Sequence, residues 1–474
     1  MSYNLIQPLN SLVKIRGGKR LPAGKALQAE PNSHPYIRVR DIGQRELPKQ
    51  GLEYVPDELF QPIARYIVET NNVVLSIVGT IGALSVVDQK YHLASLTENC
   101  VRLNGLDRQD ALYLYYYLTS PNGQYEIAKG TVGAVQPKLP IYNIEKIPVP
   151  WPDKLIRQSI SNILCALDDR IALLRETNTT LEAIAQALFK SWFVDFDPVH
   201  INADLLPSPS GRGAGGEGND SSSPHPNPLP VGEGVVLPPE IAALFPDSFE
   251  ESELGLVPSG WRVGTLEDCC ERVESGGTPK RSKANYWNGD IAWITSGEVR
   301  NPIVFESKEK ITTLGVKESS AKIWPTGTTI IAMYGATAGE VCLLANPATA
   351  NQACCGLIPS KNARSFLFFC TRRERENLAS KSSGSAQQNL NKGLVCSHKI
   401  VLPATNLVAV YEQVVGELLN GWIDNEQQAQ TLTTLRDTLL PRLISGQLRL
   451  PEAVGRVSLQ GVTRQIEAKM SGNA

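Results

Sequence analysis

Apolar residues recur at intervals of three and four along two long stretches of the chain. The first stretch runs from Ile156 to Trp192 and the second from Tyr411 to Leu443. This spacing predicts amphipathic α-helices, and a seam that lasts about six heptads is typical of a coiled coil. At 1.5 Å per residue, about 40 residues predict helices roughly 60 Å long.

The two helices are expected to pack on each other in an antiparallel pair, because neither β-rich block is long enough to cover such a seam. Asn178 and Asn425 interrupt the seams at matching places and are expected to set the register. The alternative is two ordinary amphipathic helices on separate domains. The predicted interface consists of Ile160, Ile163, Leu167, Ile171, Leu174, Asn178, Leu181, Ile184, Leu188, Val414, Leu418, Trp422, Asn425, Leu432, Leu435 and Leu439.

The rest of the chain shows alternation and turn signals that are typical of short strands. Two of the predicted strands run into glycine-rich turns, which begin at Gly79 and Gly335. The predicted strands are 36–42, 73–78, 291–295 and 329–334, and the predicted short helices are 111–119 and 365–377.

The two halves of the chain repeat each other. A shift of 251 residues places Gln136 on Gln387 and Leu139 on Leu390, and further upstream the shift drifts to about 256–257. The predicted fold class is therefore α+β, with two β-rich domains that are related by a pseudo-twofold axis and separated by the antiparallel helix pair. The predicted boundaries are 1–152 and 258–405 for the β-rich domains, 153–198 and 406–446 for the spacer helices, 199–257 for a linker and 447–474 for a C-terminal tail.

Within the linker, residues 207–234 are rich in glycine, proline and serine, which supply 7, 6 and 5 of its 28 residues. Such a composition buries too little apolar surface to offset the entropy of ordering, so this stretch is expected to be flexible. Deletion of 208–232 should therefore leave function intact.

Charge is distributed unevenly along a chain whose net charge is only −2. Residues 1–150 carry +3, residues 258–405 carry +6, and the remainder carries −11. Two mildly basic blocks among acidic connectors suit surfaces that face phosphate, although chance segregation would give the same pattern.

No feature of the sequence indicates a metal site, a membrane span or a catalytic centre. The nine cysteines form no CxxC motif, and the adjacent pairs Cys269–Cys270 and Cys354–Cys355 are badly spaced for tetrahedral zinc. The longest mostly apolar run, 73–87, is too short to cross a bilayer, so we expect a cytoplasmic protein. Walker A, GxGxxG, HExxH and GxSxG motifs are also absent. We therefore expect no catalytic residues and no bound metal.

Basic and amide side chains gather instead in the turns of both β-rich blocks. Arginine and lysine hold phosphates or read guanine, and glutamine and asparagine read adenine. Ordinary solvated turns have the same composition. The candidate DNA-binding residues are Lys19, Arg20, Arg38, Arg40, Lys129, Gln136 and Lys138 in the first block, and Lys280, Arg281, Lys283, Tyr286, Trp287, Thr295, Ser385, Gln387, Gln388, Asn389 and Lys392 in the second.

Phrases in both halves resemble one family, the DNA-specificity subunits of type I restriction-modification enzymes. In the second half they include Gly276-Gly-Thr-Pro-Lys280, Gly335-Ala-Thr-Ala-Gly339 and Gln388-Asn-Leu-Asn391. In the helices they include Leu167-Asp-Asp-Arg-Ile171 and Leu439-Leu-Pro-Arg-Leu-Ile-Ser-Gly446. The first block is more divergent, with Gly17-Gly-Lys-Arg20 where the second block has Gly-Gly-Thr-Pro-Lys.

The resemblance implies two target recognition domains, each of which reads one half of a split, asymmetric site in double-stranded DNA. It implies that the helices dock two methyltransferase subunits, which bring S-adenosylmethionine for adenine-N6 methylation. It also implies motor-nuclease subunits that use ATP and Mg²⁺ for translocation and cleavage. The chain itself is then non-catalytic and binds no cofactor.

Two alternatives remain open from the sequence. A duplicated coiled-coil scaffold or adaptor would not read DNA at all, and a bandshift with mixed-sequence duplexes would separate it from a specificity subunit. A fused enzyme with unrecognised catalytic residues would transfer methyl groups without partners.

Overall fold

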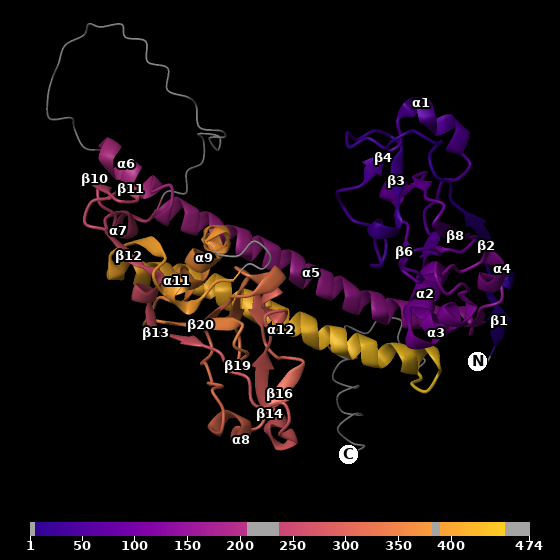
Figure 1. Cartoon of the computed structure of the whole chain (residues 1–474). Helices are drawn as coiled ribbons and strands as arrows, with labels where there is room; N and C mark the ends of the chain where they lie inside the picture. Colours follow the sequence, from indigo (N-terminus) through magenta and orange to yellow (C-terminus); the bar gives the residue numbers. More distant parts are fainter. Residues whose placement is uncertain (1–4, 206–236, 382–388, 451–474) are drawn as a thin grey trace, which may run out of the picture. The chain divides into compact units, whose positions relative to one another are not determined.

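The computed structural model describes residues 5–205, 237–381 and 389–450, and the statements below concern those residues. The chain divides into two compact units. The first unit contains 1–173 and 429–474, and the second contains 174–428. Each unit therefore combines one β-rich domain with parts of both long helices (Figure 1).

The two long helices are α5 (Lys154–Phe193) and α12 (Thr405–Ile444), each of 40 residues. They begin 251 residues apart, which is the shift of the sequence repeat. None of the helices in the described ranges combines the length and apolar composition needed to cross a bilayer.

The first unit consists of small sheets, and helix α2 (Arg108–Thr119) packs against the largest of them. Its four-stranded sheet has the order β2 (Lys14–Gly17), β8 (Cys100–Asn104), β5 (Val73–Ser76), β6 (Leu84–Val86). Its three-stranded sheet has the order β4 (Glu53–Tyr54), β3 (Pro35–Ile37), β7 (Ser95–Leu96), and β1 (Ile6–Pro8) pairs with β9 (Pro148–Pro150). Its short α-helices are α1 (Asp57–Phe60), α2 (Arg108–Thr119), α3 (Pro121–Gly130) and α4 (Ile141–Ile144), and its 3-10 helices are η1 (Leu9–Ser11), η2 (Val39–Asp41), η3 (Gln61–Ile63) and η4 (Gln89–Tyr91).

The second unit repeats this plan. Its main sheet has the order β13 (Cys270–Ser275), β20 (Cys354–Pro359), β17 (Thr329–Ala332), β18 (Val341–Leu344), β15 (Ile303–Val304). Its other strands are β16 (Glu309–Ile311), β14 (Trp287–Ile294) and β19 (Thr349–Ala350) in one sheet, the pair β12 (Arg262–Thr265) and β21 (Lys399–Leu402), and the hairpin β10 (Phe249–Ser252) and β11 (Gly255–Pro258). Its helices are α6 (Asp197–Leu205), α7 (Pro239–Ala242), α8 (Thr313–Lys317), α9 (Arg364–Arg373), α10 (Arg375–Ser380), α11 (Lys392–Cys396), η5 (Leu266–Cys269), η6 (Ala284–Tyr286), η7 (Glu298–Arg300) and η8 (Gly335–Thr337).

The long helices pack against each other within each unit. In the first unit Ile160 and Leu167 of α5 share an apolar core with Leu439 and Leu443 of α12. In the second unit the opposite ends meet, and Trp192 of α5 lies 5.7 Å from Tyr411 of α12 between ring centroids. The start of α5 thus meets the end of α12 and the reverse, which confirms an antiparallel pair.

The buried face of the helices differs in detail from the predicted seam. Ile184 and Val414 are 44% and 39% exposed, whereas the adjacent Ala185 and Val415 are buried. Each helix packs against its β-rich domain as well as against the other helix, so its buried face is displaced from the predicted seam toward Ala185 and Val415. Of the other predicted positions, Ile160, Leu167, Ile171, Leu174, Asn178, Trp422 and Leu439 are buried, and Ile163, Leu181, Leu188, Leu418, Leu432 and Leu435 pack partly buried against the cores.

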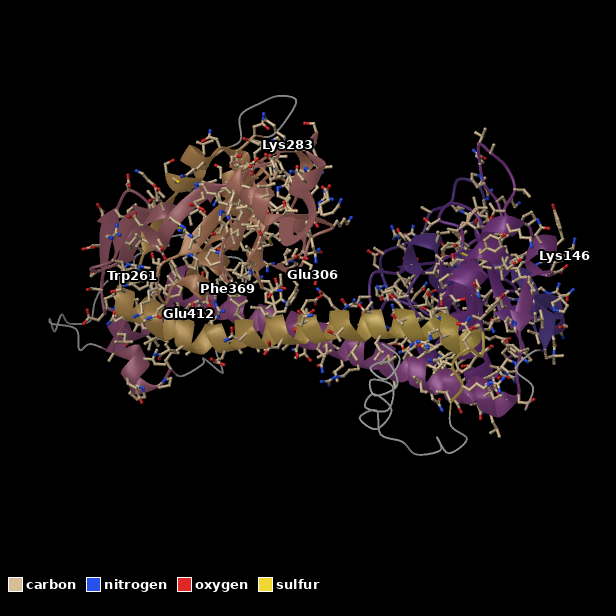
Figure 2. The ribbon with its side chains drawn as sticks, turned by 90° about the horizontal axis from the view of Figure 1, so that it is seen from below. Lys146, Trp261, Lys283, Glu306, Phe369 and Glu412 are labelled. Atoms are coloured by element: carbon tan, nitrogen blue, oxygen red, sulfur yellow. The ribbon has the colours of Figure 1, made fainter. Side chains whose placement is uncertain are left out.

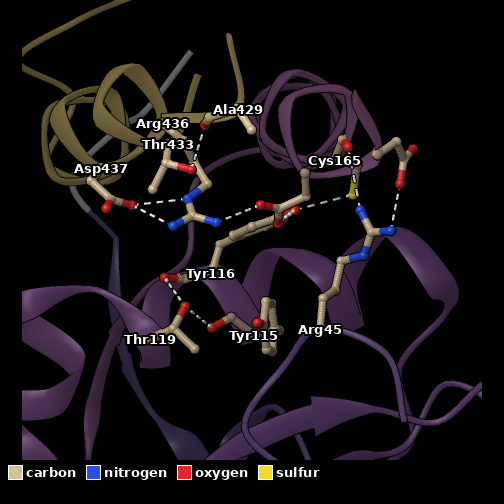
Figure 3. Close-up of polar contacts among 11 residues, drawn as sticks. Arg45, Tyr115, Tyr116, Thr119, Cys165, Ala429, Thr433, Arg436 and Asp437 are labelled. Carbon is tan, nitrogen blue, oxygen red and sulfur yellow. Dashed lines mark hydrogen bonds and ion pairs between the residues drawn. The ribbon is translucent and has the colours of Figure 1, made fainter. Parts of the chain in front are cut away.

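Asn178 and Asn425, which were expected to set the register, form no hydrogen bond with each other through the Asn178 amide. Asn178 is buried, but neither its Nδ2 nor its Oδ1 has a hydrogen-bond partner among the described residues, and Asn425 is only half-buried. A charged contact joins the helices elsewhere: Arg436 of α12 lies 2.7 Å from Asp168 of α5 (Figure 3). Register is therefore supported by this ion pair and by apolar packing.

Two other sequence predictions need correction. The predicted strand 36–42 ends at Ile37, because the Asp41 carboxylate accepts the Arg38 backbone N–H at 2.8 Å and closes a 3-10 turn. The predicted linker 199–257 contains folded structure: α6, α7 and the hairpin β10–β11 belong to the second unit, where Val199 and Phe245 are buried in its core. Residues 206–236 lie outside the described part of the chain.

Candidate nucleic-acid interface

A glycine begins an exposed loop at the same point of each β-rich domain. Gly18 donates its backbone N–H to Cys100 at 3.1 Å, and Gly276 donates to Cys354 at 2.9 Å. A Cβ on Gly18 would lie 2.1 Å from the Thr97 carbonyl oxygen, and a Cβ on Gly276 would also lie 2.1 Å from a carbonyl oxygen, that of Asn351. Only glycine allows this close approach of two backbones. We call residues 18–27 and 276–285 the glycine loops.

The next residue is held identically in both domains. Lys19 donates its N–H to Leu96 at 2.8 Å and accepts the Tyr36 hydroxyl at 2.9 Å. Gly277 donates to Ala350 at 2.8 Å and accepts the indole N–H of Trp293 at 2.9 Å. The structure therefore equates Lys19 with Gly277, one position away from the simple matching of the two Gly-Gly pairs.

In the second glycine loop Arg281 is held between aromatic and acidic side chains. Its guanidinium lies 3.8 Å from the ring centroid of Trp287 and 4.9 Å from that of Trp293. It also donates through both terminal nitrogens to Glu309, one at 2.5 Å and one at 2.8 Å. These hydrogen bonds raise the pKa of Arg281 and lower the pKa of the Glu309 carboxyl. To read a guanine, this half-exposed guanidinium would have to leave Glu309.

Some of the neighbouring candidate residues use their side chains in contacts within the protein, and others are exposed. Lys283 donates to the Tyr286 hydroxyl and lies 3.3 Å from Glu318, so its charge is partly neutralised. Figure 2 shows Lys283 at the outer edge of the domain, away from α12. The Thr295 hydroxyl donates a hydrogen bond of 2.8 Å to the Glu298 carboxylate. Lys280 is exposed, and its backbone carbonyl accepts the backbone N–H of Lys283 at 3.1 Å and the indole N–H of Trp287 at 3.3 Å.

In the first domain acidic side chains offset most of the predicted cations. Arg20 pairs with Glu98 at 3.1 Å. Arg38 and Arg40 both pair with Glu53, the latter at 3.1 Å. Lys19 is exposed in the glycine loop.

Asp41 lies beside this arginine pair, 3.5 Å from the guanidinium of Arg40. Burial raises the pKa of Asp41 to about 6, although the charge of Arg40 works against that shift. The cluster of Arg38, Arg40, Asp41 and Glu53 therefore changes its net charge between pH 5 and 7.

A second exposed loop follows helix α3 in the first domain. Val132 and Lys138 exchange two backbone hydrogen bonds of 2.9 Å, which close residues 132–138 into a tight loop. The tip is open to solvent: Val135 is 93% exposed, and Gln136 and the Lys138 side chain are exposed. We call residues 131–138 the glutamine loop. Lys129, at the end of α3, pairs with Glu126 at 3.4 Å.

The corresponding candidates of the second domain lie mostly outside the described residues. These are Ser385, Gln387 and Gln388. Asn389 and Lys392, just after them, are exposed. Asn389 pairs with Tyr334 as an isolated β-bridge, just as Lys138 pairs with Val78 in the first domain.

Both surfaces also contain side chains that the sequence did not predict. Glu53, Glu98, Glu309 and Glu318 neutralise candidate cations from positions 13 to 78 residues away in sequence, where no local signal links them. Val135 was missed because a valine is normally expected inside.

Cysteines and acidic residues provide no site of their own in the described ranges. No group of three or more metal-ligating side chains occurs there, and all nine cysteines are free thiols. Cys354 and Cys355 face opposite sides of strand β20 and enter different apolar cores. Burial raises the pKa of the Cys355 thiol to about 12, which leaves it protonated and unreactive.

Comparison with known proteins identifies the repeated unit. Residues 6–183 and 258–434 each match the profile of the type I restriction modification DNA specificity domain. The chain is 27% identical over 331 residues to the type I restriction enzyme HindI specificity subunit of Haemophilus influenzae, covering 66% of this chain and 71% of that protein. It is 20% identical to the MjaIX specificity subunit of Methanocaldococcus jannaschii, with 94% of each chain covered. A crystal structure of a type I restriction-modification system S subunit from M. genitalium has the same fold, with a TM-score of 0.58 at 14% identity over 93% of this chain and 95% of that one.

Proposed function

The chain belongs to the family of type I restriction-modification DNA specificity subunits, which are themselves non-catalytic, and from this premise we propose that it reads a split, asymmetric DNA sequence. Residues 1–152 and 258–405 are the two target recognition domains, and each reads one half of the site. This role is incompatible with the alternative function, that of a coiled-coil scaffold or adaptor that does not read DNA.

The observation that carries the proposal is the glycine loop. Its anchors are the same in both domains, from Gly18 and Gly276 onward, whereas the residues that it presents differ. The first domain presents Lys19 and Arg20, and the second presents Lys280, while Thr278 is half-buried and donates its hydroxyl to Gln352. Recognition of two different half-sites requires the same backbone arrangement in both domains with different side chains on it.

The long helices serve as the spacer in this proposal. A 40-residue helix is roughly 60 Å long, which exceeds the ~34–36 Å of one turn of duplex. The helices thus set the length of unread DNA between the half-sites.

Partner subunits supply the chemistry. Two methyltransferase subunits, which carry S-adenosylmethionine, dock on this chain and methylate adenine at N6, and motor-nuclease subunits use ATP and Mg²⁺ for cleavage. Assembly and action take place in the cytoplasm, where DNA and these cofactors are available. Each β-rich domain carries only a small net positive charge, so the partners contribute much of the grip on phosphate.

The test is to express the chain with its methyltransferase subunits in a host free of adenine methylation and to map modified adenines by long-read sequencing. We expect one bipartite motif with a fixed gap. Replacing Lys280 with alanine should change the bases of one half only, and Lys19→Ala those of the other half. A continuous motif, or a change in both halves from either variant, would contradict the proposal.

A further inference from the structure

The two domains differ in the sequence of their glycine loops, but the sequence of the glutamine loop partly recurs in the second domain. Residues 131–139 read Thr-Val-Gly-Ala-Val-Gln-Pro-Lys-Leu, and residues 382–390 read Ser-Ser-Gly-Ser-Ala-Gln-Gln-Asn-Leu. Glycine, glutamine and leucine recur at the same three positions, which are Gly133, Gln136 and Leu139 in the first domain. The residues between them differ.

The leucine that ends each of these two sequence stretches is described, and it is anchored in the same way in both domains. Leu139 donates its N–H to Ile77 at 2.9 Å, and Leu390 donates to Met333 at 2.8 Å. Ile77 and Met333 occupy equivalent places after strands β5 and β17, and both leucines are fully buried. Burial in the core explains why the leucine recurs in both domains, and no contact with a ligand is needed to explain it.

The shared glutamine has no such structural explanation in the first domain. Gln136 is exposed at the tip of a closed loop, and the described contacts of this residue come from its backbone rather than its side chain. Gly133, with φ of +94°, approaches the Gln136 carbonyl so closely that a Cβ would lie 2.9 Å from it. The glycine thus holds the glutamine in place, and the exposed Lys138 adds a positive charge two residues further on.

We propose that the glutamine loop binds the DNA sugar–phosphate backbone, and that Gln136 donates its side-chain amide to a phosphate oxygen rather than reading adenine. This inference rests on the proposed function. If the two domains read different bases, a residue type that recurs at the same position of both sequence repeats is suited to contact what all half-sites share, and that is the backbone. Lys138 supplies charge to the same contact, and the exposed Val135 packs against the deoxyribose.

The experiment uses the full chain assembled with its methyltransferase subunits. Affinity is measured by fluorescence anisotropy for the mapped motif and for duplexes that carry each single-base change in the first half-site. We expect Gln136→Ala to weaken binding to every duplex by about tenfold, with the ratios between duplexes unchanged within about twofold. Lys138→Ala should do the same and reduce the slope of log affinity against log salt by about 1.

Gln50→Ala, at another exposed glutamine of the same domain, is the matched control and should leave binding unchanged. Thermal unfolding of all three variants should match that of the parent. Loss of discrimination at one base position in Gln136→Ala would show that the loop reads a base, and unchanged affinity would show that it does not touch DNA. Either result overturns the inference, whereas a parent complex that prefers no sequence would instead overturn the proposed function.

Discussion

Asp168 of α5 accepts a hydrogen bond from Arg436 of α12 at 2.7 Å and a second, also of 2.7 Å, from the hydroxyl of Tyr116 in α2 (Figure 3). One carboxylate thus ties the β-rich domain of the first unit to both long helices. The 251-residue repeat places Leu419 and Ala185 in the second unit where the first has Asp168 and Arg436. One unit therefore uses charge where the other uses apolar packing.

Asp168→Ala should destabilise the first unit by about 1–3 kcal/mol, because it removes both hydrogen bonds and leaves Arg436 with less compensation in a mostly buried site. Hydrogen–deuterium exchange is the suitable measurement, since it reports α2 and the adjoining part of α5 separately from the rest. Exchange in 108–119 should rise, and exchange in 364–373 should not.

The second unit supplies the matched control. The triple variant Tyr116→Phe, Asp168→Leu, Arg436→Ala removes every member of the network and installs the aliphatic pair of the other unit. It should recover most of the lost stability, because apolar groups of suitable volume often replace a buried ion pair without cost. A triple variant less stable than Asp168→Ala would show that the site cannot repack.

Glu309→Gln should raise the affinity of the complex for DNA of any sequence, by a few-fold at low salt. The change removes a negative charge and releases Arg281 from its carboxylate, while the stacking on Trp287 remains. Anisotropy titrations at two salt concentrations measure it, and the gain should shrink at the higher one. A drop in affinity would mean that the pair orients Arg281 for a direct DNA contact.

DNA binding should strengthen as the pH falls from 7 to 5, in part because Asp41 takes up a proton near its pKa of about 6. Its neutralisation leaves the charges of Arg38 and Arg40 opposed by Glu53 alone. The raised pKa also means that burial of the charged carboxylate has its full cost in stability above about pH 6, and that this cost shrinks as the pH falls and vanishes only below the ordinary value of 3.8. Asp41→Asn should reduce the pH dependence of binding and raise the melting temperature at pH 7. If the parent and the variant show the same pH profile, Asp41 is not the titrating group.

Gly356→Ala should destabilise the second unit by about 1–3 kcal/mol, because the new Cβ would lie 2.7 Å from ring carbons of Trp324, which is fully buried. Gly297→Ala is the control, since its nearest neighbour would be 3.9 Å away and its φ is −69°. Thermal unfolding followed by tryptophan fluorescence should separate the two variants by several degrees. Equal melting temperatures would indicate that Trp324 has room to move.

The sequence by itself determined the elements that depend on short-range patterns. The long helices follow from their apolar spacing, and the buried strand β5 follows from its apolar run. The duplication follows from residues that recur after a shift of 251 residues, such as Gln136 and Gln387. Each of these signals is carried by residues that are neighbours in the chain or copies of one another, so no knowledge of distant contacts is needed.

Only the tertiary structure decided which polar side chains are free to act. The pairing of β14 with β16 places Glu309 opposite Trp293, and Arg281 meets Glu309 because it stacks on Trp293. Asp168 meets Arg436 because the helices run antiparallel. The choice of Ala185 and Val415 over Ile184 and Val414 as buried positions likewise depends on which neighbours pack against each helix. The physical reason is common to all three cases: the pairing of a charge and the burial of a face are set by groups distant in sequence, and local composition does not encode their positions.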